Sequence, residues 1–400
     1  SYRRFVRDDE NTTLFTVTGL PKGARVRLAT MDAYTGVVYD VATGGGSSGS
    51  FTPLQSNMSA GAEGARATVR VRIQGLTGVW LPDVGSVESF TFTGANADAL
   101  RRAGNYNASS GTAVVTSGLT KGDAYAIDTV VPPQPGDTAL KKASFAPITL
   151  PRAQAVPDIV ATKAADIVAK ATTPIGQVRA LQKALSTDGY FSHGLPGEVT
   201  SLPGHGADRI STMLGAQQMV GDDEQYAVAM ALMARSLGIP ARVVMGFRPD
   251  DPNAAPKTFT AKGSDLHAWV EVAFQGFGWV AFDPTPPKDH VATNQRPQPK
   301  PQPKPQVPQP PPPAQQSVEQ PPMTQKDAVK SDKENPLGAI LLAVLAVGGS
   351  AAGVAAILLA PFVVIGGLKA ARRRRRRAAE RPIDRISGGW DELVDRASDF

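Results

Sequence analysis

The stretch that decides the fold of this chain is VGDDEQYAVAMALMARSLGIPARVVMGF, residues 220–247. It predicts a helix over residues 222–237, with Asp222 as N-cap and Gln225 as its capping-box partner. Gly238 and Pro240 then end the helix. The apolar run 241–247 predicts a strand, so the stretch indicates a buried helix followed by a buried strand.

Two more strands follow, HAWVEVAF (267–274) and GWVAFDP (278–284), joined by the tight turn QGFG. In an antiparallel hairpin, the start of one strand and the end of the next fall at the same rim. We therefore expect His267 and Asp283 to lie near one another, with the helix start within reach. The predicted candidate site is Asp223, His267 and Asp283.

The chain before this stretch changes character near residue 150. Residues 156–185 have helical periodicity, with a break at Pro174. Residues 1–150 instead contain short runs with period-two alternation, broken by Gly, Pro and Asn. These predicted strands are residues 13–20, 24–32, 36–42, 66–76, 89–94, 111–119 and 123–132. We predict an α+β chain, with a β-rich domain at 1–150 and an α+β domain at 151–287.

Residues 288–336 are predicted to form a linker. The centre reads RPQPKPQPKPQVPQPPPP, and alternating proline favours an extended polyproline II spacer. Such a spacer suits a domain held away from a membrane, within or across a cell wall. A ligand for an SH3-type domain is the rival interpretation of the same segment.

Residues 337–368 contain no charged residue and are long enough for one transmembrane helix. The alternative is a buried helix of a soluble domain. The basic run KAARRRRRR (369–377) marks the cytoplasmic side, which places residues 1–336 outside and the tail 369–400 inside. Since the chain begins at Ser1, we expect a longer parent chain, with room for upstream spans.

The cytoplasmic tail carries most of the basic excess. The net charge is +6, yet residues 1–287 hold equal numbers of basic and acidic residues, so we expect no nucleic-acid partner. At the chain end, Trp390, Leu393, Val394 and Ala397 share one side of a short amphipathic helix. That helix is a candidate contact for the membrane surface or a cytoplasmic partner.

The chain contains no cysteine. Disulfides, thiolate metal sites and a cysteine nucleophile are thereby excluded. Asp223, His267 and Asp283 could form a metal site of two carboxylates and one histidine. Their spacing has no metal signature of its own, so we expect neither a metal nor a cofactor.

Residues 189–287 resemble the core of the bacterial transglutaminase-like superfamily, which has a papain-like fold. The resemblance rests on GDDEQYAVA, GIPAR, HAWVEV and GWVAFDPTPP. In that family a cysteine at the helix N-terminus attacks an amide or acyl carbonyl, a histidine takes its proton and an aspartate orients the histidine. By position, His267 matches the histidine, Asp283 the aspartate and Asp223 the cysteine.

An aspartate at the cysteine position implies that thiol chemistry has been lost. A helix N-terminus stabilises the Asp223 carboxylate rather than activating it as a nucleophile. The resemblance extends to membrane-anchored members whose domain faces outward between spans. We therefore expect a membrane protein that binds a peptide, a protein or cell-wall material. The alternatives are a hydrolase that uses Asp223, alone or with a metal, and a structural component of a membrane assembly.

Overall fold

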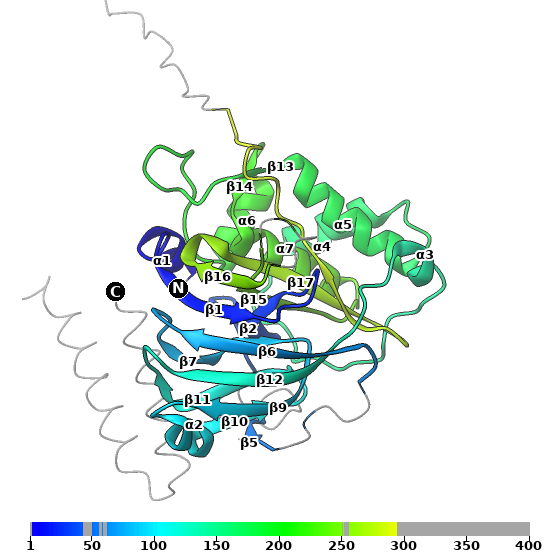
Figure 1. Cartoon of the computed structure of the whole chain (residues 1–400). Coiled ribbons are helices and arrows are strands. Elements are labelled where there is room, and N and C mark those ends of the chain that lie inside the picture. The colour runs from blue at the N-terminus through cyan, green and yellow to red at the C-terminus, as the bar shows by residue number, and fades with distance from the viewer. Residues whose placement is uncertain are drawn as a thin grey trace, which may run out of the picture. The chain divides into compact units, whose positions relative to one another are not determined.

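The described part of the chain begins mainly with strands, continues with helices and ends with strands, which makes it a mixed α+β fold (Figure 1). The computed structural model describes residues 2–42, 50–55, 58, 62–249, 251 and 256–293. All of these fall within one compact unit. The N-terminal region is β-rich, as the sequence predicts.

One sheet has five antiparallel strands in the order β16-β1-β6-β12-β9. Its central strands follow the period-two rule: Val69, Val71 and Ile73 are buried, while Arg70 and Arg72 between them are exposed. The strands are β1 (Thr13–Thr18), β6 (Ala65–Ile73), β9 (Ser86–Thr93), β12 (Ala124–Val131) and β16 (Thr258–Lys262).

A second five-stranded antiparallel sheet has the order β18-β17-β15-β2-β8. It carries the predicted hairpin, and all but one residue of its strand β17 is buried. The strands are β2 (Val26–Met31), β8 (Asp83–Val84), β15 (Ala241–Phe247), β17 (Leu266–Phe274) and β18 (Gly278–Phe282).

Smaller sheets complete the β structure. A four-stranded sheet has the order β5-β10-β11-β7, and β3-β4 and β13-β14 are two-stranded. The strands are β3 (Ala33–Tyr34), β4 (Tyr39–Asp40), β5 (Thr52–Pro53), β7 (Gly78–Leu81), β10 (Gly104–Asn107), β11 (Thr112–Leu119), β13 (Gly189–Phe191) and β14 (Met219–Gly221).

The boundary predicted at residue 150 does not separate the sheets. Strand β16, from the later part of the chain, pairs with β1. Strand β15 pairs in turn with β2. Each five-stranded sheet therefore contains strands from both predicted domains. Residue 150 marks a change from strands to helices, and the two parts share their sheets.

The first two long helices after residue 150 are separated at the predicted break, Pro174. Thr173 caps the second of them by accepting a hydrogen bond from the Gly176 backbone N–H, and Pro174 occupies its first turn. The longer helices are α4 (Asp158–Val168), α5 (Pro174–Asp188), α6 (Ala207–Gly215) and α7 (Asp223–Ser236). Short helices are α1 (Tyr2–Arg7), α2 (Ala97–Ala103), α3 (Asp137–Leu140) and the 3-10 turn η2 (Gly263–Asp265).

Helix α7 is the central helix of the fold. Every residue from Gln225 to Ala234 is buried, because the helix is lined by Ala, Met, Leu and Val on all sides. It packs against β15 and β17 and against helices α4 and α5 (Figure 1). Burial on all sides fixes the position of its N-terminus relative to β17.

Within the described residues, no helix combines the length and apolar character needed to cross a bilayer. The predicted span 337–368 and tail 369–400 lie outside the described residues, as does the linker from residue 294 onward.

Candidate functional site

The start of helix α7 is capped as the sequence predicts. Asp222 accepts a hydrogen bond from the Glu224 backbone N–H at 3.0 Å, and Gln225 Oε1 accepts one from the Asp222 N–H at 2.9 Å. This capping box fixes the first turn of the helix. Asp223, the next residue, lies in that turn with its carboxylate buried at 2% exposure.

The Asp223 carboxylate contacts three side chains. Its Oδ1 lies 3.0 Å from His267 Nδ1 and 3.4 Å from Thr285 Oγ1, while its Oδ2 lies 3.1 Å from Tyr2 Oη. Burial acts to raise the pKa of Asp223. The charge of His267 and its hydrogen bond outweigh burial, so the pKa lies below its ordinary value. Asp223 is therefore a well-stabilised carboxylate.

Asp283 is placed differently. Its Oδ2 lies 2.9 Å from Arg248 Nη2, and its Oδ1 accepts from the Thr285 backbone N–H at 3.2 Å. Asp223 is thus hydrogen-bonded to His267, whereas the Asp283 carboxylate forms an ion pair with Arg248. Within the described part of the chain, the buried Nε2 of His267 has no hydrogen-bond partner.

Two more histidines pair with the acidic residues on either side of Asp223. His193 Nδ1 lies 3.0 Å from Asp222 Oδ2, and His205 Nδ1 lies 2.8 Å from Glu224 Oε1. Sequence analysis did not assign either histidine to the site. One sequence signal could have indicated these pairs. Three consecutive acidic residues lie at one helix start, and the chain has only four histidines that could pair with them.

His193, His205 and His267 differ in the surroundings of Nε2, the ring nitrogen that does not face the carboxylate. His205 Nε2 accepts a hydrogen bond from the Tyr39 backbone N–H at 2.7 Å, so that imidazole is held on both sides. His267 Nε2 is buried, whereas the His193 side chain is 15% exposed. Only His193, among these three, has its ring on the wall of a described pocket.

The N-terminal helix α1 covers the Asp223–His267 pair. Tyr2 is 5% exposed, and its hydroxyl also lies 3.0 Å from the Leu266 carbonyl oxygen. Burial, aided by the negative charges of Asp223 and Asp222, raises the pKa of Tyr2 well above its ordinary value. Arg3 anchors the same helix by donating to the His193 carbonyl oxygen at 2.8 Å.

The described residues contain no group of three or more His, Asp or Glu side chains placed to hold a metal ion. The two-carboxylate, one-histidine set considered from the sequence is not assembled, because Asp283 pairs with Arg248.

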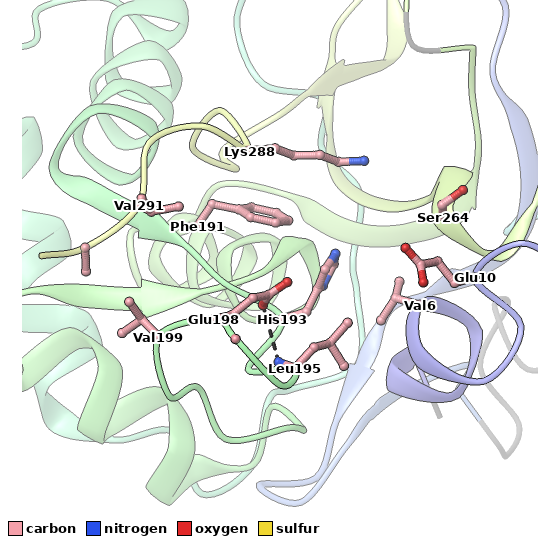
Figure 2. Close-up of a pocket in the computed structure, with 12 residues that line it drawn as sticks. Val6, Glu10, Phe191, His193, Leu195, Glu198, Val199, Ser264, Lys288 and Val291 are labelled. Carbon is pink, nitrogen blue, oxygen red and sulfur yellow. Dashed lines mark hydrogen bonds between the residues drawn. The ribbon is translucent and has the colours of Figure 1, made fainter. Parts of the chain in front are cut away.

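A pocket of about 540 Å³ opens beside these pairs (Figure 2). Four segments line it: the end of α1 with Glu10, the loop 191–199, Ser264 of η2 and the segment 288–292. Its wall combines apolar side chains with the His193 ring and the side chains of Glu10, Glu198, Ser264 and Lys288 (Figure 2).

Comparison with known proteins identifies the family of the α-helical and hairpin region. The family model of the transglutaminase-like superfamily matches residues 161–284. The protein-glutamine gamma-glutamyltransferase of Pseudomonas aeruginosa is 37% identical over 95 residues, 24% of this chain and 14% of that protein. The uncharacterized protein YebA of Bacillus subtilis is 28% identical over 134 residues, 32% of this chain and 18% of that protein.

A solved structure, the periplasmic domain of TgpA from Pseudomonas aeruginosa bound to ethylmercury, aligns with 71% of this chain and 92% of its own length. The TM-score is 0.49 and the sequence identity 21%. The matched segments span less than a fifth of either curated relative. On the family match and the bacterial relative, residues 161–284 of this chain form a domain of the transglutaminase-like superfamily.

Proposed function

We propose that this chain is a membrane-anchored transglutaminase-like protein that has no thiol catalysis and binds a peptide, a protein partner or cell-wall material outside the cytoplasm. One observation carries the proposal. Asp223, the residue at the nucleophile position of the family motif, is a buried carboxylate held by Tyr2 and His267. No cysteine exists in the chain to replace it.

The chemistry of the Asp223 carboxylate supports this proposal. Both Asp223 oxygens accept hydrogen bonds, from His267 and Thr285 on Oδ1 and from Tyr2 on Oδ2, and hydrogen bonds to an anion lower its reactivity as a nucleophile. Its lowered pKa means that the surroundings stabilise the anion. Acyl transfer through it would proceed by an anhydride, from a weak nucleophile on an unreactive amide.

The Pseudomonas aeruginosa relative is named as a protein-glutamine gamma-glutamyltransferase. That name describes the relative, and its matched segment is a small part of the whole protein. A thiol-dependent transfer of that kind has no nucleophile in the present chain. A binding role uses the same domain without requiring a thiol.

The test is amine incorporation into a glutamine donor by the purified 400-residue chain. We expect no activity above that of Asp223→Ala and no effect of iodoacetamide. Asp223→Cys introduces a thiol at the helix start, and Asp223→Ser is its matched control. Transamidation by the unmodified chain above the Asp223→Ala level contradicts the proposal. Peptide hydrolysis by the unmodified chain that Asp223→Asn abolishes would instead favour an aspartate-dependent hydrolase.

Anchoring and orientation are proposed from the sequence, through the uncharged run 337–368 and the basic run 369–377. Protease added to intact cells should cut within residues 288–336 and leave the region of Trp390 protected. Cleavage near Trp390 from outside the cell contradicts this orientation.

A further inference from the structure

The pocket in Figure 2 borders the acid–histidine pairs but is separate from the Asp223–His267 contact, since neither residue lines it. Its walls come from segments far apart in sequence, from Val6 in α1 to Ala292 near the end of the described chain. A volume of about 540 Å³ lies within the range of roughly 300–1,000 Å³ that is typical of small-ligand sites.

The hydrogen bond between Asp222 and His193 fixes the chemistry of the pocket-facing nitrogen. An ionised carboxylate only accepts hydrogen bonds, so Nδ1 of His193 must carry the hydrogen that joins it to Asp222 Oδ2. In the neutral imidazole, Nε2 then has a lone pair and acts as an acceptor. It bonds none of the described residues, and the ring is directed into the pocket (Figure 2).

Two charges of opposite sign line the same pocket as His193. The Glu10 carboxylate and the Lys288 ammonium are both directed toward the pocket (Figure 2). Neither forms an ion pair with any residue that the structure describes. A second acid of the wall, Glu198, differs from Glu10 because its Oε2 already accepts from Ser192 Oγ at 3.1 Å.

The pocket also has apolar lining residues. Val6, Phe191 and Ala292 are buried in its wall. Val291, in contrast, is 58% exposed on the same wall, which is unusual for a large aliphatic side chain next to a pocket. An apolar group that enters the pocket would remove this surface from water.

We propose that this pocket binds a short zwitterionic peptide with an apolar side chain. The α-ammonium group donates to His193 Nε2 and Glu10, the carboxylate pairs with Lys288, and the apolar side chain lies against Phe191 and Val291. This inference rests on the proposed binding function and specifies its ligand. A peptide with both ends free satisfies both charges of the pocket at once.

The dipeptide leucyl-alanine tests the assignment by isothermal titration calorimetry with the 400-residue chain. We expect leucyl-alanine to bind, and its N-acetylated and C-terminally amidated forms to bind at least tenfold more weakly. Free leucine is the control for a single amino acid and should also bind more weakly. Equal affinity for the blocked forms or for leucine overturns the proposal, as does an absence of leucyl-alanine binding.

Variants locate the site. Glu10→Gln and Lys288→Met should each weaken leucyl-alanine binding about tenfold. Glu63→Gln and Lys170→Met, which change exposed residues outside the pocket lining, should leave it unchanged. Thermal melts verify folding of all four variants. If both pocket variants bind leucyl-alanine as tightly as the unmodified chain does, the pocket assignment fails while peptide binding stands. Failure of the proposed function would appear separately, as amine incorporation by the unmodified chain.

Discussion

The hydroxyl of Tyr2 lies 3.1 Å from Oδ2 of Asp223, so a helix at the N-terminus of this chain closes over the first turn of the central helix. The contact is buried on both sides, with Tyr2 at 5% and Asp223 at 2% exposure. It joins residues 221 positions apart. Helix α1 is therefore part of the candidate site as well as part of the fold.

Replacing Tyr2 by Phe tests this contact. The variant removes a hydrogen bond to a buried carboxylate, and bonds to charged groups contribute about 1.5–3 kcal/mol. We expect the free energy of unfolding to fall by about 2 kcal/mol in urea denaturation at neutral pH. Tyr125→Phe is the matched control, because Tyr125 donates to a neutral acceptor, the Pro82 carbonyl oxygen. A smaller loss for Tyr2→Phe than for Tyr125→Phe would contradict the charge-assisted contact.

Asp223→Ala should destabilise the chain through its buried ionic contacts. The cap of α7 is Asp222, so the larger cost in the variant is that His267 and Tyr2 lose a charged partner. Breaking a buried pair costs about 3–5 kcal/mol, and we expect a value near the lower end. Asp223→Asn retains an acceptor oxygen and should cost less.

The effect of Asp223 on stability depends on pH in a defined direction. Its folded pKa is lowered, so it contributes stability above the unfolded value of about 3.9 and loses it as pH falls through the folded pKa. The difference between the wild-type chain and Asp223→Ala should therefore shrink in acid. A difference that grows below pH 4 would contradict a stabilised carboxylate.

Asp222 should have the opposite effect on how stability changes with pH. Burial raises its pKa to about 6 despite the hydrogen bond from His193. Between about pH 6 and pH 4 the folded chain binds a proton that the unfolded chain does not, so stability rises as pH falls, by on the order of 2–3 kcal/mol. Asp222→Asn keeps an acceptor for the Glu224 N–H and should remove this rise. An unchanged pH profile in that variant would rule out Asp222 as its source.

Local patterns predicted much of the fold, because they depend on neighbouring residues. The capping pair Asp222–Gln225 and the break at Pro174 are properties of a few consecutive side chains, and both are present. Strand pairings across the chain were not predicted. The pairing of β15 with β2 joins segments about 200 residues apart, and alternation identifies a strand without identifying its partner.

The candidate site was predictable in part for the same reason. The predicted helix start and the predicted hairpin placed Asp223 and His267 close together, and in the structure the two side chains are in contact. Asp283 was expected at the same rim, and the pairing of its carboxylate with Arg248, which follows β15, was not predicted. His193 lies in a loop, where periodicity gives no direction to a side chain. Its pairing with Asp222 depends on how that loop packs.

Gly246 provides a test of the sheet that carries the site. It lies in β15, with Arg27 of β2 and His267 of β17 as its neighbours across the two ladders. A Cβ there would collide with the Val26 carbonyl oxygen and come within 2.8 Å of Trp269 Cη2. Position 246 therefore has no room for a side chain, since the strands cannot separate without losing backbone hydrogen bonds.

Gly246→Ala should accordingly lower the free energy of unfolding by about 1–3 kcal/mol or more, the usual cost of overpacking. Gly136→Ala is the matched control, because a Cβ at that position meets no atom within 4 Å. We also expect Gly246→Ala to shift the His267 ring signals in NMR spectra, since the two residues face each other across β15 and β17. A Gly246→Ala chain as stable as Gly136→Ala, with unshifted His267 signals, would show that the sheet relaxes without strain. In that case the close approach of β2 to β15 would not constrain the position of His267.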